Sequence, residues 1–141
     1  MQLPSILLPL FVEVLLTLGL LIWMIPLRQS DFTKGVARHD NVALREPNWS
    51  KKTLQVSYCF SNQFELPVLF YVLTILEIVT RHADLVFLIL AWVFVLTRIM
   101  HAMVYTTSNK VRVRGAWYGF GATALAIAWI IFIVRILLVL P

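Results

Sequence analysis

The sequence predicts an all-α integral membrane protein, a bundle of four transmembrane helices that forms one domain over residues 1–141. Two observations lead to this prediction. Apolar residues make up 60% of the chain and charged residues 13%, with a mean hydropathy of +0.85, whereas soluble domains are roughly half apolar. Four long apolar segments account for most of the length, so little chain remains for a water-facing core.

Each of the four apolar segments is long enough to cross the roughly 30 Å hydrocarbon core of a bilayer as a helix. The first lacks the basic start and cleavage site of a secretory signal, so we expect it to stay in the mature protein. Pro67 is expected to kink the second helix, because proline removes a backbone donor. The expected helices cover about residues 4–27, 53–80, 85–105 and 115–140.

The distribution of Lys and Arg predicts the orientation of the bundle. Residues 28–52 carry six basic residues and residues 106–114 carry three, whereas the connection between the second and third helices carries only Arg81. Because basic loops stay on the cytoplasmic side, we expect both termini to face the opposite side. The membrane would be the inner membrane in a bacterium and the endoplasmic reticulum in a eukaryote. This asymmetry accounts for the net charge of +5, and we expect no nucleic-acid partner.

Two stripes of polar side chains lie inside the predicted spans, where a charged group costs several kcal/mol unless it pairs or faces water. Both stripes follow helical spacing, so each occupies one face of its helix. They consist of Tyr58, Asn62 and Glu65 in the second helix and of Arg98, His101 and Tyr105 in the third. Counting outward from the turn near His82 places the two stripes at the same depth if the helices are antiparallel.

Two interpretations of these stripes remain open. In the first, Glu65 and Arg98 form an ion pair that only joins helices, and a hydrogen bond between Asn62 and His101 supports it. In the second, the six polar groups line a cavity that opens toward the basic loops. Such a cavity would receive an anion, because a guanidinium group binds a carboxylate through two parallel hydrogen bonds.

Other charged groups are assigned from their positions alone. Arg112 and Arg114 follow the third helix in a short basic loop and are expected at the mouth of the cavity. Toward the opposite side of the membrane, we expect Arg135 to neutralise either Glu13 or Glu77 in a structural pair. We expect no metal site.

The two stripes resemble the MAPEG family, the membrane-associated proteins in eicosanoid and glutathione metabolism. The segment NQFELP, residues 62–67, is similar to the family's Asn-x-x-Glu motif followed by Pro. The segment RIMHAMVYTT, residues 98–107, is similar to the corresponding part of the microsomal glutathione transferases. Arg112 lies seven residues before a Gly-Phe-Gly stretch and resembles the arginine that closes the family's active site. The resemblance covers essentially the whole chain.

The resemblance implies a homotrimer with its sites between subunits. There glutathione, as co-substrate, would attack a lipophilic electrophile or reduce a lipid hydroperoxide. The reactive species would be a thiolate, which nearby arginines favour by stabilising its charge. The expected partners are the lipid bilayer and a hydrophobic small-molecule substrate. The resemblance implies catalysis by Arg112 and glutathione contacts from Asn62, Glu65, Arg98, His101, Tyr105, Arg28 and Arg114.

Two positions depart from the family's pattern. Many members have an arginine four positions before the Asn, where this chain has Tyr58, and some have a tyrosine after the Glu, where it has Leu66. Each change removes a potential glutathione contact, and the family includes members without catalytic activity. The alternative hypothesis is therefore a non-catalytic lipid-binding or scaffold protein of the same architecture. A small transporter subunit with charges along its pathway is a third hypothesis.

Overall fold

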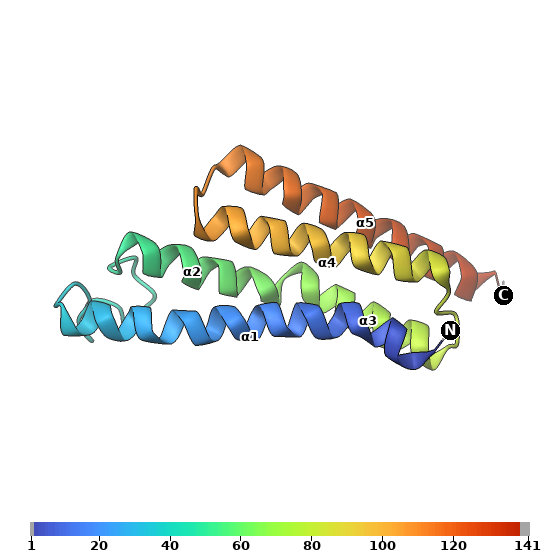
Figure 1. Ribbon diagram of the computed structural model, residues 1–141, viewed down its shortest axis with the longest axis horizontal. Helices are drawn as coiled ribbons and strands as arrows, with labels where there is room; N and C mark the ends of the chain where they lie inside the picture. The colour runs from blue at the N-terminus through green and yellow to red at the C-terminus, as the bar shows by residue number, and fades with distance from the viewer. Residues whose placement is uncertain (1, 139–141) are drawn as a thin grey trace.

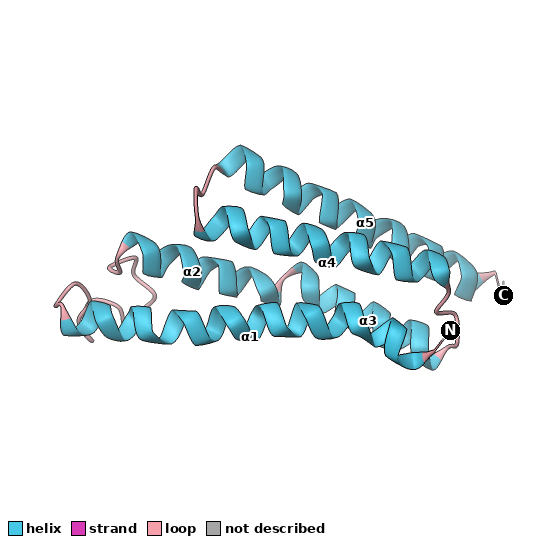
Figure 2. Cartoon of the chain, in the orientation of Figure 1, coloured by secondary structure: helices cyan, strands magenta, loops and turns pink. Residues whose placement is uncertain are grey.

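The structure, a computed structural model, describes residues 2–138, which form helices and loops without strands (Figures 1 and 2). Four of its helical segments are long and apolar enough to cross a membrane, which confirms the predicted all-α architecture with four spans. The elements are α1 (Leu3–Thr33), α2 (Lys51–Ser61), the 3-10 helix η1 (Asn62–Phe64), α3 (Leu66–Val79), α4 (Leu85–Thr106) and α5 (Val111–Leu137). Residues 139–140, predicted as the end of the last helix, lie outside the described residues.

The connections alternate between the two ends of the bundle (Figure 1). The loops at residues 34–50 and 107–110 lie at one end, which we call the basic end, and the turn at residues 80–84 lies at the other. The helix α1 begins and α5 ends beside that turn. Met1 and Pro141, whose side of the membrane was predicted, lie outside the described residues.

The outward faces of the helices are apolar. Leu15, Ile22 and Val79 are among the large apolar side chains exposed on the spans, at 65%, 69% and 73%. Exposure of this kind on four long helices is expected where lipid rather than water is the solvent. The helices α4 and α5 approach each other closely at Gly121, where a Cβ atom would lie only 2.6 Å from the Thr97 hydroxyl oxygen.

Two helices extend further at the basic end than the sequence predicts. The helix α1 continues to Thr33, and the buried Asp31 carboxylate accepts a hydrogen bond of 2.9 Å from the Ser50 amide, which ties the loop to the helix. The helix α5 begins at Val111 rather than at residue 115, because Asn109 adopts a left-handed conformation that reverses the chain early. Arg28 and the two arginines after α4 therefore lie in helices and not in loops.

The second span is interrupted, not merely kinked at Pro67 as predicted. The chain leaves the α-helix at Asn62, and Glu65 has φ −100° and ψ −105°, outside the helical region. Pro67 occupies the first turn of the new helix α3, where its missing N–H group is tolerated. Glu65 is exposed at this interruption.

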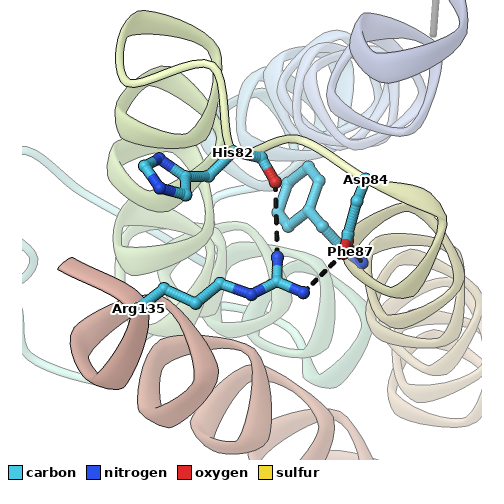
Figure 3. A network of polar contacts seen from close by, with 4 residues as sticks. All are labelled: His82, Asp84, Phe87 and Arg135. Carbon is cyan, nitrogen blue, oxygen red and sulfur yellow. Dashed lines mark hydrogen bonds and ion pairs between the residues drawn. The ribbon is translucent and has the colours of Figure 1, made fainter. Parts of the chain in front are cut away.

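Arg135 forms its direct ion pair with Asp84, which the sequence did not predict (Figure 3). It also attracts the nearby Glu77 carboxylate, one of the two predicted partners, but no ion pair joins it to Glu13 within residues 2–138. Its Nη2 atom donates to Asp84 Oδ2 at 2.6 Å, and Nη1 donates to the His82 carbonyl at 3.4 Å. Asp84 Oδ1 also accepts a hydrogen bond of 2.9 Å from the Phe87 amide and so caps α4. Burial alone would raise the pKa of the Asp84 carboxyl, but the hydrogen bonds from Arg135 and Phe87 outweigh it and hold the pKa below its usual value.

We predict that Asp84→Asn and Asp84→Ala separate the ion pair from the helix cap. Asparagine can still cap α4, so Asp84→Asn should cost only the ion pair, ~0.2–1 kcal/mol for a partly exposed pair. Asp84→Ala should cost about 1 kcal/mol more. Because the native pKa is lowered, the ion pair stabilises the fold above the unfolded pKa near ~4 and is lost as the pH falls through the native value.

Thermal unfolding in detergent between neutral and acidic pH checks this prediction. The wild type should be more stable than Asp84→Asn at neutral pH, and the difference should shrink toward zero in acid. A difference that stays constant across this range would show that the Asp84 charge is not responsible.

Candidate functional site

Arg98 occupies the centre of the bundle. Its side chain is fully buried, and its Nη2 atom donates to the Asn62 backbone carbonyl at 3.2 Å. That carbonyl lies where α2 ends, and carbonyl groups at helix ends lack partners within the helix. The guanidinium carbon also lies 5.6 Å from the centre of the Tyr118 ring. One arginine therefore links α4 to the helix break and to α5.

The acidic group that interacts most strongly with Arg98 comes from α1. Glu13 is fully buried, and its interaction with Arg98 exceeds that of Glu65. The sequence placed Glu13 toward the end of the bundle that holds Arg135, whereas in the structure it lies near Arg98. Neither Glu13 oxygen accepts a hydrogen bond from the part of the chain that the structure describes, so the two side chains are not in direct contact.

The predicted contacts of Glu65 and His101 differ from those in the structure. No ion pair joins Glu65 to Arg98 within residues 2–138, where Glu65 is exposed; a pair between subunits stays a prediction. His101 Nδ1 instead lies 2.9 Å from the Arg114 backbone carbonyl, in hydrogen-bond contact. No hydrogen bond between His101 and Asn62 is present in residues 2–138, where the His101 ring contacts the Tyr105 and Tyr118 rings.

A cavity of about 580 Å³ opens at the basic end. Arg114 lies over the Tyr105 ring, with its guanidinium carbon 4.1 Å from the ring centre, and it donates to the Asn109 side-chain oxygen. These two contacts hold the guanidinium at the cavity wall. The cavity is lined by Trp49, Lys51, Leu54, Gln55, Tyr58, Tyr105, Asn109 and Arg114.

The cavity contains only part of the predicted site. Tyr105 and Arg114 line it, whereas the other predicted ligands on α4 lie deeper in the bundle. Arg112 is exposed and does not line it. Arg28 lines a second cavity of about 580 Å³, where its Nη2 atom donates to Ser57 Oγ at 3.4 Å. The two cavities share Tyr58, Trp49 and Leu54.

Several residues of this region were missed from the sequence. Gln55 lies three residues before Tyr58 and lines the same cavity, so helical spacing could have identified it. Tyr118 could not be linked to Arg98 from spacing within one helix, because the contact joins α4 to α5. Trp49 and Asn109 lie in loops, whose path the sequence pattern does not specify.

A family model described as the MAPEG family matches residues 6–136. The chain belongs to the MAPEG family. No curated protein and no solved structure gave a significant match. The resemblance read from the polar stripes is therefore confirmed at the level of the family, which contains glutathione transferases and peroxidases as well as non-catalytic members. A closer relation of this MAPEG chain to the microsomal glutathione transferases stays a prediction.

We predict that Glu13 and Arg98 are energetically coupled in this MAPEG chain. Glu13→Gln or Arg98→Gln alone leaves the other charge buried without compensation, which should destabilise the protein by ~3–5 kcal/mol. The double variant removes both charges and should lose clearly less stability than the sum of the two single variants.

Thermal unfolding of the four proteins of this double-mutant cycle measures the coupling. Glu65→Gln is the matched control, because Glu65 is exposed and interacts with Arg98 more weakly. Its coupling to Arg98→Gln within the subunit should be smaller than that of Glu13. If the effects of Glu13→Gln and Arg98→Gln simply add, Glu13 is not the counter-charge.

Proposed function

We propose that this MAPEG chain is a membrane glutathione transferase or peroxidase that acts on lipophilic electrophiles or lipid hydroperoxides. The observation that carries the proposal is the position of Arg114 at the cavity wall, where Tyr105 and Asn109 restrain it. A guanidinium held this way loses little conformational freedom when it binds an anion. Gln55 and Tyr58 add an amide and a hydroxyl group to the same cavity.

The lining of the cavity matches the chemistry of glutathione. This tripeptide carries two carboxylates, an ammonium group and a thiol, and the cavity offers two cations, Arg114 and Lys51. Its volume of about 580 Å³ falls within the range of small-molecule sites, ~300–1,000 Å³. The Tyr58 and Tyr105 hydroxyl groups are available to donate hydrogen bonds to a thiolate or a carboxylate.

Two reactions are open to a thiolate in this cavity. In the transfer reaction, the sulfur forms a bond to an electrophilic carbon, and the leaving group departs with its electron pair. In the peroxidase reaction, the sulfur attacks the terminal oxygen of the hydroperoxide, and the departing alkoxide takes a proton to become an alcohol. A second glutathione then attacks the resulting sulfenic acid, which gives the disulfide and water.

We assign stabilisation of the thiolate to Arg114, although the family pattern points to Arg112. The two residues are two positions apart on α5, so at about 100° per residue their side chains leave the helix on nearly opposite faces. Only Arg114 lines the cavity of this chain. Arg112 would reach a site only if that site lay against a neighbouring subunit, so it serves as the matched comparison.

We further propose that the functional unit is a homotrimer. The exposed Glu65 carboxylate lies midway along the second span, where contact with lipid would cost several kcal/mol. Phe64 beside it is also exposed, at 60%. A neighbouring subunit packed over this face would remove the carboxylate from lipid and could supply a basic partner. Glu65 would then be available to the ammonium group of glutathione.

The alternative function, a non-catalytic lipid-binding or scaffold protein, is favoured by Tyr58. Its side chain is 46% exposed and lines both cavities of the basic end, at the position where many relatives carry an arginine. A neutral phenol there leaves the two cavities with one cation fewer than the family pattern provides. Weaker anion binding would follow, and the experiment below distinguishes this alternative.

We predict that Arg114→Ala raises the pKa of the bound glutathione thiol and lowers turnover of a chloronitrobenzene electrophile by ~10²-fold or more. Arg112→Ala should change both quantities only slightly, and both variants should keep the wild-type fold. The thiolate absorbance of bound glutathione, followed against pH in detergent, gives the thiol pKa directly.

Three outcomes are informative. A thiolate midpoint that moves in Arg114→Ala alone supports the assignment. A midpoint that moves in Arg112→Ala alone overturns it and places the site against a neighbouring subunit. Absence of a thiolate signal and of turnover in the wild type at saturating glutathione would contradict the enzymatic function and favour the non-catalytic alternative.

A further inference from the structure

An apolar groove runs between α1 and α4 on a different side of the bundle from the proposed glutathione cavity. Its volume is about 340 Å³, and it shares no lining residue with the cavity that contains Arg114. Leu15, Trp23, Ile99 and Met103 are among the side chains that line it. The groove lies between two spans and has apolar walls, so in a membrane its occupant comes from the hydrocarbon phase.

Gly19 keeps this groove open. It lies in the middle of α1, where glycine costs about 1 kcal/mol of helix stability relative to alanine. A Cβ atom at this position would meet no other atom within 4 Å, so the glycine is not required for close packing against α4. Gly121 differs, because a Cβ atom there would collide with Thr97. The missing side chain at Gly19 therefore leaves space for another molecule.

A cation lies at the end of the groove nearest the basic loops. The Lys52 ammonium group lies 4.6 Å from the centre of the Trp23 ring and donates to the Thr106 backbone carbonyl. Both Trp23 and Thr106 line the groove. Lys52 follows the start of α2, and Thr106 ends α4, so this end of the groove is at the boundary of the spans, where phospholipid headgroups lie.

The Lys52 charge is not neutralised by a carboxylate within residues 2–138, since the ion pairs there use Arg38 and Arg135. An ammonium group has three donors, and the Thr106 carbonyl accepts from one of them. Two donors remain for an anion above the groove. The arrangement thus combines an apolar slot open to the bilayer with a cation at the level of the headgroups.

We propose that the groove between α1 and α4 binds an anionic phospholipid, with one acyl chain along Gly19 and the headgroup phosphate on Lys52. The charge of Lys52 selects an anionic lipid over a zwitterionic one, and the apolar walls select an acyl chain over a polar ligand. The site is separate from the proposed glutathione cavity and does not depend on the proposed function.

Native mass spectrometry of the purified protein tests the proposal with phosphatidylglycerol and phosphatidylcholine that carry the same acyl chains. The wild type should retain phosphatidylglycerol preferentially. Lys52→Gln should weaken phosphatidylglycerol binding by about fivefold. It should weaken phosphatidylcholine binding by a smaller factor, because the choline cation offsets the charge of the phosphate that contacts Lys52. Lys110→Gln is the matched control, because it removes a cation from the same end of the molecule but outside the groove.

Gly19→Leu fills the groove and should weaken the binding of both lipids. Gly115→Leu is its control, since a Cβ atom there also meets nothing within 4 Å and the residue does not line the groove. If Gly19→Leu does not fold, Leu15→Trp fills the groove from the next turn of α1.

Unchanged lipid binding in the groove-filling variant overturns the acyl-chain assignment, and an unchanged lipid preference in Lys52→Gln overturns the headgroup assignment. Loss of oligomers in Gly19→Leu with unchanged lipid binding would identify a second copy as the occupant.

Discussion

The buried Arg98 guanidinium, a permanent charge inside a bundle of apolar spans, determines how the helices pack. The Arg98 guanidinium is fully buried and cannot be left without compensation in a hydrocarbon environment. Three helical segments meet this need, because Glu13 supplies an acidic group from α1, Asn62 a carbonyl from the helix break, and Tyr118 a ring face from α5. The side chain therefore acts as a centre around which the spans are arranged.

The break in the second span at Asn62 is part of the environment of Arg98, and it affects both the inside and the outside of the bundle. Inside the bundle the Asn62 carbonyl accepts from both Arg98 and the Glu65 amide, and outside it the Glu65 carboxylate is exposed midway along the span. One turn along α4, His101 contacts the Arg114 carbonyl and fixes the start of α5. The position of the Arg114 side chain over Tyr105 depends on that start. The buried centre and the cavity at the basic end are thus parts of one arrangement.

The sequence predicts two kinds of feature. These are the number of spans, which follows from contact with lipid, and the residues that share a face of one helix. Four spans follow from apolar length, and Arg98 and His101 share a face because their spacing is helical. The partnership with Glu13 was missed because helical spacing relates residues of one helix and Glu13 lies on another. The choice between Arg112 and Arg114 depends on where α5 begins, which the conformation of Asn109 decides. The sequence placed both arginines in a loop at the mouth of the cavity, whereas in the structure both lie in α5 and only Arg114 lines it.

Equilibrium titration of glutathione into the purified wild-type protein tests the central claim, that the cavity at the basic end is a glutathione site, most directly. Calorimetry in detergent should give saturable binding at or below roughly millimolar concentration, a common range for enzyme substrates. Binding should weaken as salt is added, because cations at the cavity wall attract the carboxylates of the ligand. Saturable and salt-sensitive binding is expected for a glutathione site, whereas the absence of heat at millimolar glutathione in a folded protein would show that the cavity does not bind glutathione.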